Sequence, residues 1–138
     1  MNSIEWVNSV NGKPWSDRAT GPNAFDCWGL VIDYFRRVHK LQLETVDGYE
    51  EGANVEDAAS NEISTGRWIE TDEPERDCVF VIESESGYVK HVGIIVNINR
   101  VGLYAVHSKA EGSQVMANRI AAMQKLHSDK IKYYKRAE

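Results

Sequence analysis

Apolar positions in the first third of the chain predict two helices. Residues 3–10 form a short amphipathic segment that ends at Asn11-Gly12, a helix-stop signal. A longer segment follows Asn23, which we expect to be its N-cap. Its apolar side chains recur every three or four positions, at Cys27, Leu30, Val31, Tyr34, Phe35 and Val38. Trp28 and Ile32 widen this apolar face, so we expect the longer helix to be covered on more than one side.

The C-terminal half of the chain shows the alternation that is typical of strands. Residues 78–83, 88–98 and 101–108 are predicted strands, and a turn around residues 97–102 joins the last two into an antiparallel meander. We expect a helix over residues 116–127, followed by a final strand in the segment KIKYYK. This order of elements indicates an α+β fold with helices packed on an antiparallel sheet.

The segment between these regions, residues 44–77, carries more than half of the acidic residues of the chain. Within it we predict a short helix that Asn54 caps and Gly66 ends, with an apolar stripe that includes Ala58 and Ala59. Because charged segments usually face water, the simplest interpretation of this acidic insert is a solvated cover.

Length and composition exclude several classes of protein. A chain of 138 residues fits one domain, over residues 1–138. Its net charge of -5 disfavours a nucleic-acid partner. The two cysteines form no CxxC pair, so neither a disulfide framework nor a thiol zinc site is expected. The N-terminus lacks a signal-peptide pattern and no apolar run is long enough for membrane insertion, so we expect a soluble protein made in the cytosol.

Two histidines lie on neighbouring predicted strands. Alternation places His91, Gly93 and Ile95 on one face of the first strand, and Leu103, Ala105 and His107 on one face of the second. Since a short turn fixes the antiparallel register, we expect His107 to lie near His91. Gly93 leaves space beside the imidazole.

Cys27, at the start of the longer helix, completes a set of residues that is typical of nucleophilic catalysis. A helix N-terminus stabilises a thiolate by at most about 2 kcal/mol, which lowers a thiol pKa of about 8.5 by only about 1.5 units. A neighbouring imidazolium must supply the rest, and His91 is the candidate. Backbone N–H groups of the first helical turn would then bind the oxyanion.

Each of these residues also has a structural interpretation. Cys27 could be a small buried side chain, His91 a hydrogen-bonded core histidine, and His107 a polar group at the end of a strand. A metal site of these three residues is a further alternative, although their spacing matches no common zinc motif. We interpret Cys78 as a packing residue. The remaining histidines, His39 and His127, lie at polar helix ends and are expected to be solvated.

The segments GKPW, FDCWGLV, EPERDCVFVIE, HVGIIV and YAVHS occur in this order. Together they resemble the NlpC-type cell-wall cysteine peptidases across nearly the whole chain. Further features of the chain are the segment DCWGLV, the early short helix, the acidic middle helix followed by RWIE, and the closing YYKR. Through these features the chain also resembles the branch of this family that is found in the tails of bacteriophages.

The resemblance implies a papain-like α+β fold with a central antiparallel sheet of about five or six strands. It also implies that Cys27 is the nucleophile, His91 the base and His107 the third polar residue of a Cys-His-His triad. No cofactor is expected. The implied substrate is the peptide of peptidoglycan, cleaved between a D-γ-glutamyl residue and a diamino acid.

The same resemblance implies that Asp26 helps to shape the substrate pocket. Two further positions of that pocket carry tryptophan here: Trp15, where the family often has tyrosine, and Trp28, where many members have serine. A phage role implies tail-tip partners and action in the host cell envelope. Two alternatives stay open, a structural tail-tip component with little or no catalysis and an injected antibacterial amidase toxin.

Overall fold

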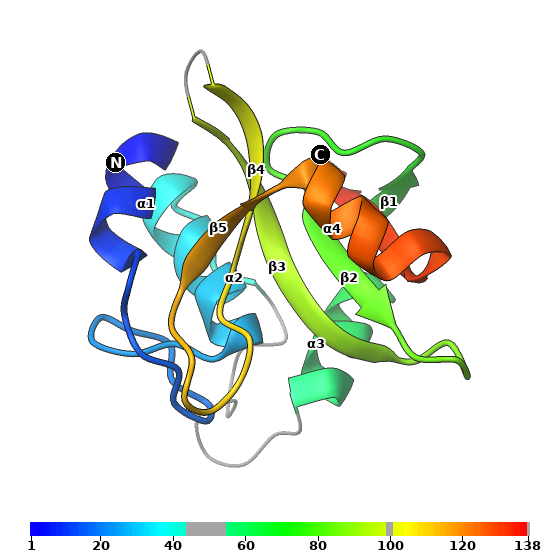
Figure 1. Cartoon of the computed structure of the whole chain (residues 1–138), viewed down its shortest axis with the longest axis horizontal. Helices are drawn as coiled ribbons and strands as arrows, with labels where there is room; N and C mark the ends of the chain where they lie inside the picture. The colour runs from blue at the N-terminus through cyan, green and yellow to red at the C-terminus, as the bar shows by residue number, and fades with distance from the viewer. Residues whose placement is uncertain (44–54, 99–100, 138) are drawn as a thin grey trace.

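The computed structural model describes residues 1–43, 55–98 and 101–137. Within these residues, an antiparallel sheet of six strands has the order β1-β6-β2-β3-β4-β5, with helices on both of its faces (Figure 1). The helices are α1 (Ser3–Val10), α2 (Cys27–Val38), α3 (Val55–Ile63) and α4 (Ile120–His127). The strands are β1 (Trp68–Thr71), β2 (Val79–Glu83), β3 (Val89–Ile98), β4 (Gly102–His107), β5 (Met116–Arg119) and β6 (Ile131–Arg136). The predicted α+β class, with an antiparallel sheet of about five or six strands, is confirmed.

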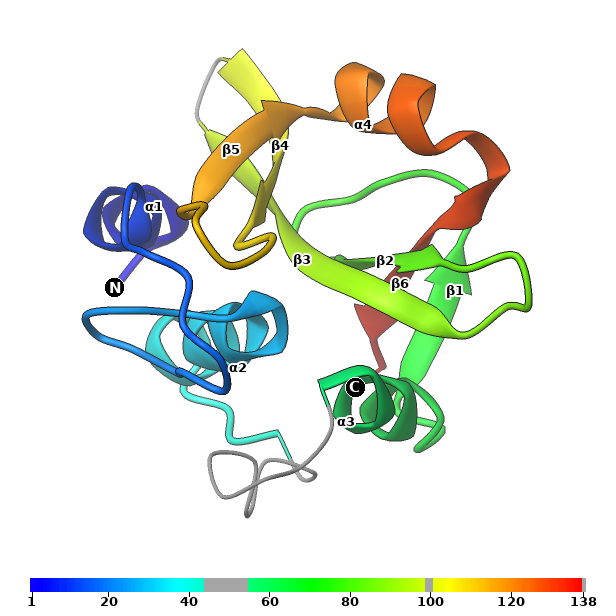
Figure 2. The ribbon, with the colours of Figure 1, turned by 60° about the horizontal axis from the view of Figure 1, so that its bottom comes forward.

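One face of the sheet packs against α1, α2 and α3. Figure 2 shows α2 and α3 on the side of β3 opposite to α4. The sheet side chains of this face are aliphatic and buried: Val79, Val81, Val92, Ile94, Val96 and Val106. The indole N–H of Trp6 donates to the buried carboxylate of Asp33 at 2.9 Å, which ties α1 to α2. This face holds the larger hydrophobic core, and α2 lies within it.

The opposite face is covered by α4 and holds a smaller core. Its buried members are Cys78, Phe80, Ile82, Ile95, Ala105, Met123, Ile131 and Tyr133. Residues that pair directly across antiparallel strands share a face, so the pairs Ile82 with His91 and Phe80 with Gly93 place His91 on this side. The α4 face therefore combines a small core with titratable side chains.

The longer helix begins at Cys27, and the predicted N-cap Asn23 is wrong. Asp26 is the N-cap, because its carboxylate accepts the N–H of Gly29 at 2.6 Å and that of Arg18 at 2.8 Å. Residues 20 and 25 form an isolated antiparallel bridge, which closes the turn of residues 21–24 just before the helix. A Cβ on Gly29 would overlap the carbonyl oxygen of Ala19, so glycine is required where this loop crosses the helix.

The meander of β2, β3 and β4 and the final strand β6 are confirmed. The helix predicted over residues 116–127 is wrong in its first four residues, which form the edge strand β5 and pair with β4. The edge strand β1, which pairs with β6, was not predicted. The turn at residues 99–100 lies outside the described residues.

The acidic region contains the predicted helix, α3, while its predicted cap Asn54 lies outside the described residues. Ala58 and Ala59 are buried, and α3 packs against β3 and α2. The predicted apolar stripe is therefore confirmed at Ala58 and Ala59, and α3 covers the sheet with this face. None of the helices in the described ranges has the length and apolar character needed to cross a bilayer.

Candidate active site

Cys27 is the first residue of α2, and its side chain is 7% exposed. Asp26, which precedes it, is buried, and its two carboxylate oxygens accept backbone N–H groups from α2 and from the loop before it. The carboxylate therefore fixes the loop and the first helical turn relative to one another. This places a thiol at the positive end of a helix dipole, where negative charge on sulfur is stabilised.

The structure brings His91 and His107 together. Nε2 of His91 lies 2.8 Å from Nδ1 of His107, and the ring centroids are 5.1 Å apart. Ile95 pairs with Ala105, and both side chains lie on the α4 face of the sheet. Side chains an even number of residues apart on one strand share a face, so His91, four residues before Ile95, and His107, two residues after Ala105, lie on this face too. Sequence alternation alone was sufficient to predict this pair.

Asn118 extends the pair into a chain of three side chains, and it was not among the predicted site residues. Its Oδ1 lies 2.6 Å from Nε2 of His107. Asn118 pairs with Ala105 across β4 and β5, so it shares the face of His107. It was missed because residues 116–119 were predicted to be helical. An assignment of this segment to an edge strand would have placed it beside His107.

The acceptor on Asn118 determines the tautomers along this chain. A carbonyl oxygen can only accept, so Nε2 of His107 carries the hydrogen and Nδ1 of His107 is the acceptor. His91 then donates from Nε2 to that nitrogen. Nδ1 of His91 is consequently left without a hydrogen, as a base requires.

Phe80 supports both imidazoles from within the small core. Its ring centroid lies 6.1 Å from that of His91 and 5.7 Å from that of His107, in edge-to-face arrangements. A Cβ on Gly93 would overlap this ring and would also crowd the carbonyl oxygen of Val106. The space that Gly93 leaves is therefore filled by Phe80, which restricts the orientations open to both histidines.

Burial is the largest cause that lowers the pKa of His91, to about 3, and the charges of His107, Lys109 and His127 lower it further. Burial also lowers the pKa of His107, against the hydrogen bond that His107 donates to Asn118, which raises it. At neutral pH both rings are therefore uncharged. The thiolate-imidazolium pair predicted from the sequence would need the negative sulfur to offset this burial, and it stays a prediction.

A junction of loops connects the histidines to the start of α2. Ser108, which follows His107, donates from its hydroxyl to the carbonyl oxygen of Phe25 at 2.7 Å. Strand β3 pairs with β4 only from Ile94 to Ile98. The earlier residues of β3, which include His91, therefore extend beyond the end of β4. The segment that leads into α2 therefore meets the sheet at the end that carries the histidines.

A cavity of about 520 Å³ opens beside the histidine pair on the α4 side of the sheet. His91, His107 and Asn118 line it, together with apolar side chains and three further basic ones. The basic side chains are Lys90, Lys109 and His127. The expectation that His127 is simply solvated is therefore wrong, because it is half-buried and faces the same cavity as the pair.

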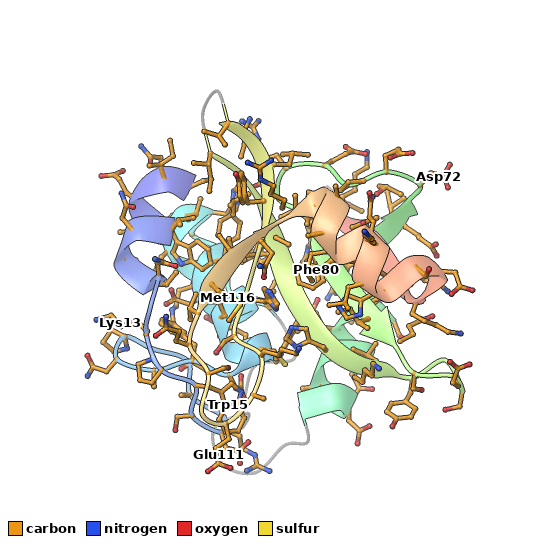
Figure 3. The ribbon with its side chains drawn as sticks, in the orientation of Figure 1. Lys13, Trp15, Asp72, Phe80, Glu111 and Met116 are labelled. Atoms are coloured by element: carbon orange, nitrogen blue, oxygen red, sulfur yellow. The ribbon has the colours of Figure 1, made fainter. Side chains whose placement is uncertain are left out.

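The predicted substrate-binding residues lie in different environments. Trp15 is partly exposed in the loop of residues 12–25, and Figure 3 shows it beside Glu111, where this loop meets the one before β5. Its backbone N–H donates to Ser113 at 3.1 Å. Trp28 has no exposed surface, so a role in binding would require the indole to leave the core. Asp26 is engaged by the backbone of the loop and helix. Binding roles for these three residues stay predictions.

Two further interpretations from the sequence concern Cys78 and a metal site. Cys78 is fully buried in the smaller core, as its packing role predicts, and burial raises the pKa of its thiol. Within the described ranges, no group of three His, Cys, Asp or Glu side chains is placed to hold a metal ion.

The sheet, the buried central helix and the histidine pair define a papain-like α+β protein. Residues 12–134 match the NlpC/P60 family, and the chain belongs to this family of cysteine peptidases and related hydrolases. Among solved structures, the chain is similar to the NlpC/p60 domain of the peptidoglycan hydrolase SagA, at 15% identity and a TM-score of 0.60. The similarity covers 96% of this chain and 93% of that domain. No curated protein matches the sequence.

Proposed function

We propose that this protein is a cysteine peptidase that hydrolyses amide bonds in the peptides of peptidoglycan, with Cys27 as nucleophile and His91 as base. The chain of hydrogen bonds from His91 through His107 to Asn118 carries the proposal. It leaves an unprotonated nitrogen on His91 at the end of the sheet where α2 begins. Membership of the NlpC/P60 family and the fold shared with a peptidoglycan hydrolase domain support the substrate class.

In the first half of the reaction, Nδ1 of His91 accepts the proton of the Cys27 thiol as the sulfur attacks the carbonyl carbon. Backbone N–H groups in the first turn of α2 stabilise the oxyanion. The C–N bond then breaks, and the imidazolium returns the proton to the departing amine. The product is a thioester on Cys27, and the amine leaves with the proton that the thiol had lost.

In the second half, His91 acts as base toward water. It accepts a proton as the oxygen of water attacks the thioester carbonyl, and the C–S bond then breaks. The proton returns to the sulfur, which regenerates the thiol and releases a carboxylic acid. His107 keeps the imidazole of His91 in one orientation and one tautomer throughout, and Asn118 does the same for His107.

The bond cleaved is the one between D-γ-glutamate and the diamino acid, and the setting is a bacteriophage tail that opens the host cell wall. The motif order and the acidic middle helix followed by RWIE support this setting. The protein would be made in the bacterial cytoplasm, join other tail-tip proteins and act in the cell envelope of the host.

Digestion of purified peptidoglycan tests the proposal. The intact chain should release muropeptides that mass spectrometry identifies as products of cleavage within the stem peptide, and Cys27→Ala should release none. Cys78→Ala is the matched control and should retain the activity. No release by a folded wild-type chain, together with tight binding to tail-tip proteins, would instead favour a structural component.

A further inference from the structure

We propose that the cavity beside the histidine pair is a subsite for a free carboxylate of the substrate, bound through Lys109 and Lys90. The ligand would be a peptide in which an aliphatic residue next to the scissile amide carries that carboxylate. This inference rests on the proposed function, because the cavity is lined by the proposed base. It adds a specificity, for the free acid over the amidated peptide, that the triad itself does not provide.

The first observation is the charge of the lining. The chain carries more acidic than basic residues, yet the described residues that line this cavity include two lysines and three histidines and no acidic side chain. Three separate parts of the chain supply the outer basic groups. Lys90 comes from β3, Lys109 from the segment after β4, and His127 from the end of α4. At neutral pH the positive charge at this cavity is that of the two lysines, on a protein that is negative overall.

The second observation is that these two lysines have no acidic partner. Among the described residues, neither Lys90 nor Lys109 forms an ion pair, whereas Lys130, Lys132 and Lys135 each face a glutamate. A lysine next to a cavity without a neighbouring carboxylate can bind an anionic group of a ligand. The two cavity lysines thus differ from Lys130, Lys132 and Lys135, whose charges are already met by glutamates.

The third observation is that the charge of Lys109 reaches the histidines. After burial, the charge of Lys109 contributes to the low pKa of His91, His107 and His127, and Lys90 contributes at His127. A carboxylate beside Lys109 would offset this effect. Binding would therefore raise the pKa of His91 and make it easier for the imidazole to hold a proton during the reaction.

The shape and the apolar part of the cavity define the rest of the ligand. A volume of about 520 Å³ is sufficient for a residue-sized group. Its apolar surface comes from Ile82, Met116, Met123 and Leu126. Methylene groups can pack against these side chains while the terminal carboxylate meets the lysines. The two sets of side chains together match an aliphatic acidic residue better than a neutral or aromatic one.

Binding to the Cys27→Ala protein separates this inference from catalysis. The probes are the tripeptide L-alanyl-γ-D-glutamyl-diaminopimelate and two forms in which either the glutamyl or a diaminopimelyl carboxylate is an amide. Calorimetry should show that one of the two amidated peptides binds more weakly than the free acid, by about tenfold or more. A hydrogen bond to a charged group contributes enough binding free energy for such a difference. NMR titration should show a higher pKa for His91 in the complex with the acid.

Lysine variants in the Cys27→Ala background show which groups recognise the acid. Lys109→Gln should remove most of the preference, and Lys90→Gln should reduce it. Lys125→Gln, an exposed change on α4 away from the cavity, is the matched control and should keep it. Equal binding of the three peptides, or an unchanged preference in both cavity variants, would overturn the subsite.

Hydrolysis of the same peptides by the intact chain distinguishes the two proposals. Turnover of all three at equal kcat/KM would retain the peptidase and overturn the subsite. Absence of turnover would count against the peptidase alone, and the binding preference in the Cys27→Ala protein would then decide on the subsite by itself.

Discussion

The two faces of the central sheet consist of the same strands, yet they carry different kinds of side chain. The face under α1, α2 and α3 is aliphatic and holds most of the buried core. The face under α4 has a smaller core, two hydrogen-bonded histidines and an open cavity. The first face gives the protein its stability and holds the helix that carries Cys27, and the second leaves room for a substrate next to a base.

Each face depends on a glycine for a close approach. Gly29 lets the backbone at Ala19 cross α2, and Gly93 lets the ring of Phe80 lie beneath the imidazoles. On the α2 face the approaching group is main chain, while on the α4 face it includes a side chain that can be shortened. The helix that carries the nucleophile is therefore held by a close backbone contact, whereas the histidines are held by side-chain packing.

The largest expected effect is the loss of the base. His91→Gln should lower kcat/KM by ~10² to 10⁴, because general base catalysis contributes about that much. His39→Gln, which removes the imidazole beside Tyr34 and Phe35 at the other end of α2, should leave the rate unchanged. Steady-state kinetics on the tripeptide provides the measurement. Retention of more than about a tenth of the activity in His91→Gln would rule out its role.

The two glycines give a direct test of the contrast between the faces. Gly29→Ala should destabilise the protein by about 3 kcal/mol or more, and Gly93→Ala by about 1 to 3 kcal/mol, since overpacking costs such amounts. Denaturant unfolding gives both values. Phe80→Leu should restore part of the stability in the Gly93→Ala background and none in the Gly29→Ala background. Equal rescue in both would show that the faces are not packed differently.

Asn118→Leu should lower kcat by roughly tenfold to a hundredfold with little change in KM, because His107 loses the acceptor that fixes its tautomer. Asn118→Asp retains an acceptor at this position and should recover much of the rate. Nitrogen chemical shifts of the two imidazoles report the tautomers directly. If Asn118→Leu changed the nitrogen chemical shifts but kept a normal kcat, the tautomer of His107 would have no role in catalysis.

The low pKa of His91 predicts a smaller effect, on stability against pH. Burial holds the folded pKa at about 3, below the ordinary 6.5, so the unfolded chain takes up a proton that the folded chain excludes. Stability should therefore fall as the pH decreases from about 6.5 toward 3, by about 1.4 kcal/mol per pH unit from this group. Urea unfolding at pH 6 and pH 5 should show a smaller loss for His91→Gln than for the wild type. Identical losses of stability in the two proteins would show that His91 is solvated.

The sequence was sufficient for the parts of the site that depend on local periodicity. The helix that begins at Cys27 follows from its apolar spacing, and the shared face of His91 and His107 follows from alternation. The N-cap was predicted at Asn23 and lies at Asp26. Both residue types cap helices, and the bridge between residues 20 and 25, which places Asn23 in the turn before the helix, is not visible in the pattern.

The parts that were missed depend on contacts between distant segments. The segment around Asn118 has no strand alternation and becomes a strand only by pairing with β4. The neutral state of His91 comes from burial by the surrounding fold, and the position of His127 comes from the way α4 packs over the sheet. Such tertiary effects leave no signal in the spacing of residues along the chain.

Alkylation of the two cysteines tests most directly the central claim that Cys27 and His91 act as one unit. Iodoacetamide at pH 7, followed by peptide mass spectrometry, should modify Cys27 well before the buried Cys78. His91→Gln should slow the modification of Cys27 and leave that of Cys78 unchanged. Faster modification of Cys78, or an unchanged rate at Cys27 in His91→Gln, would contradict the account.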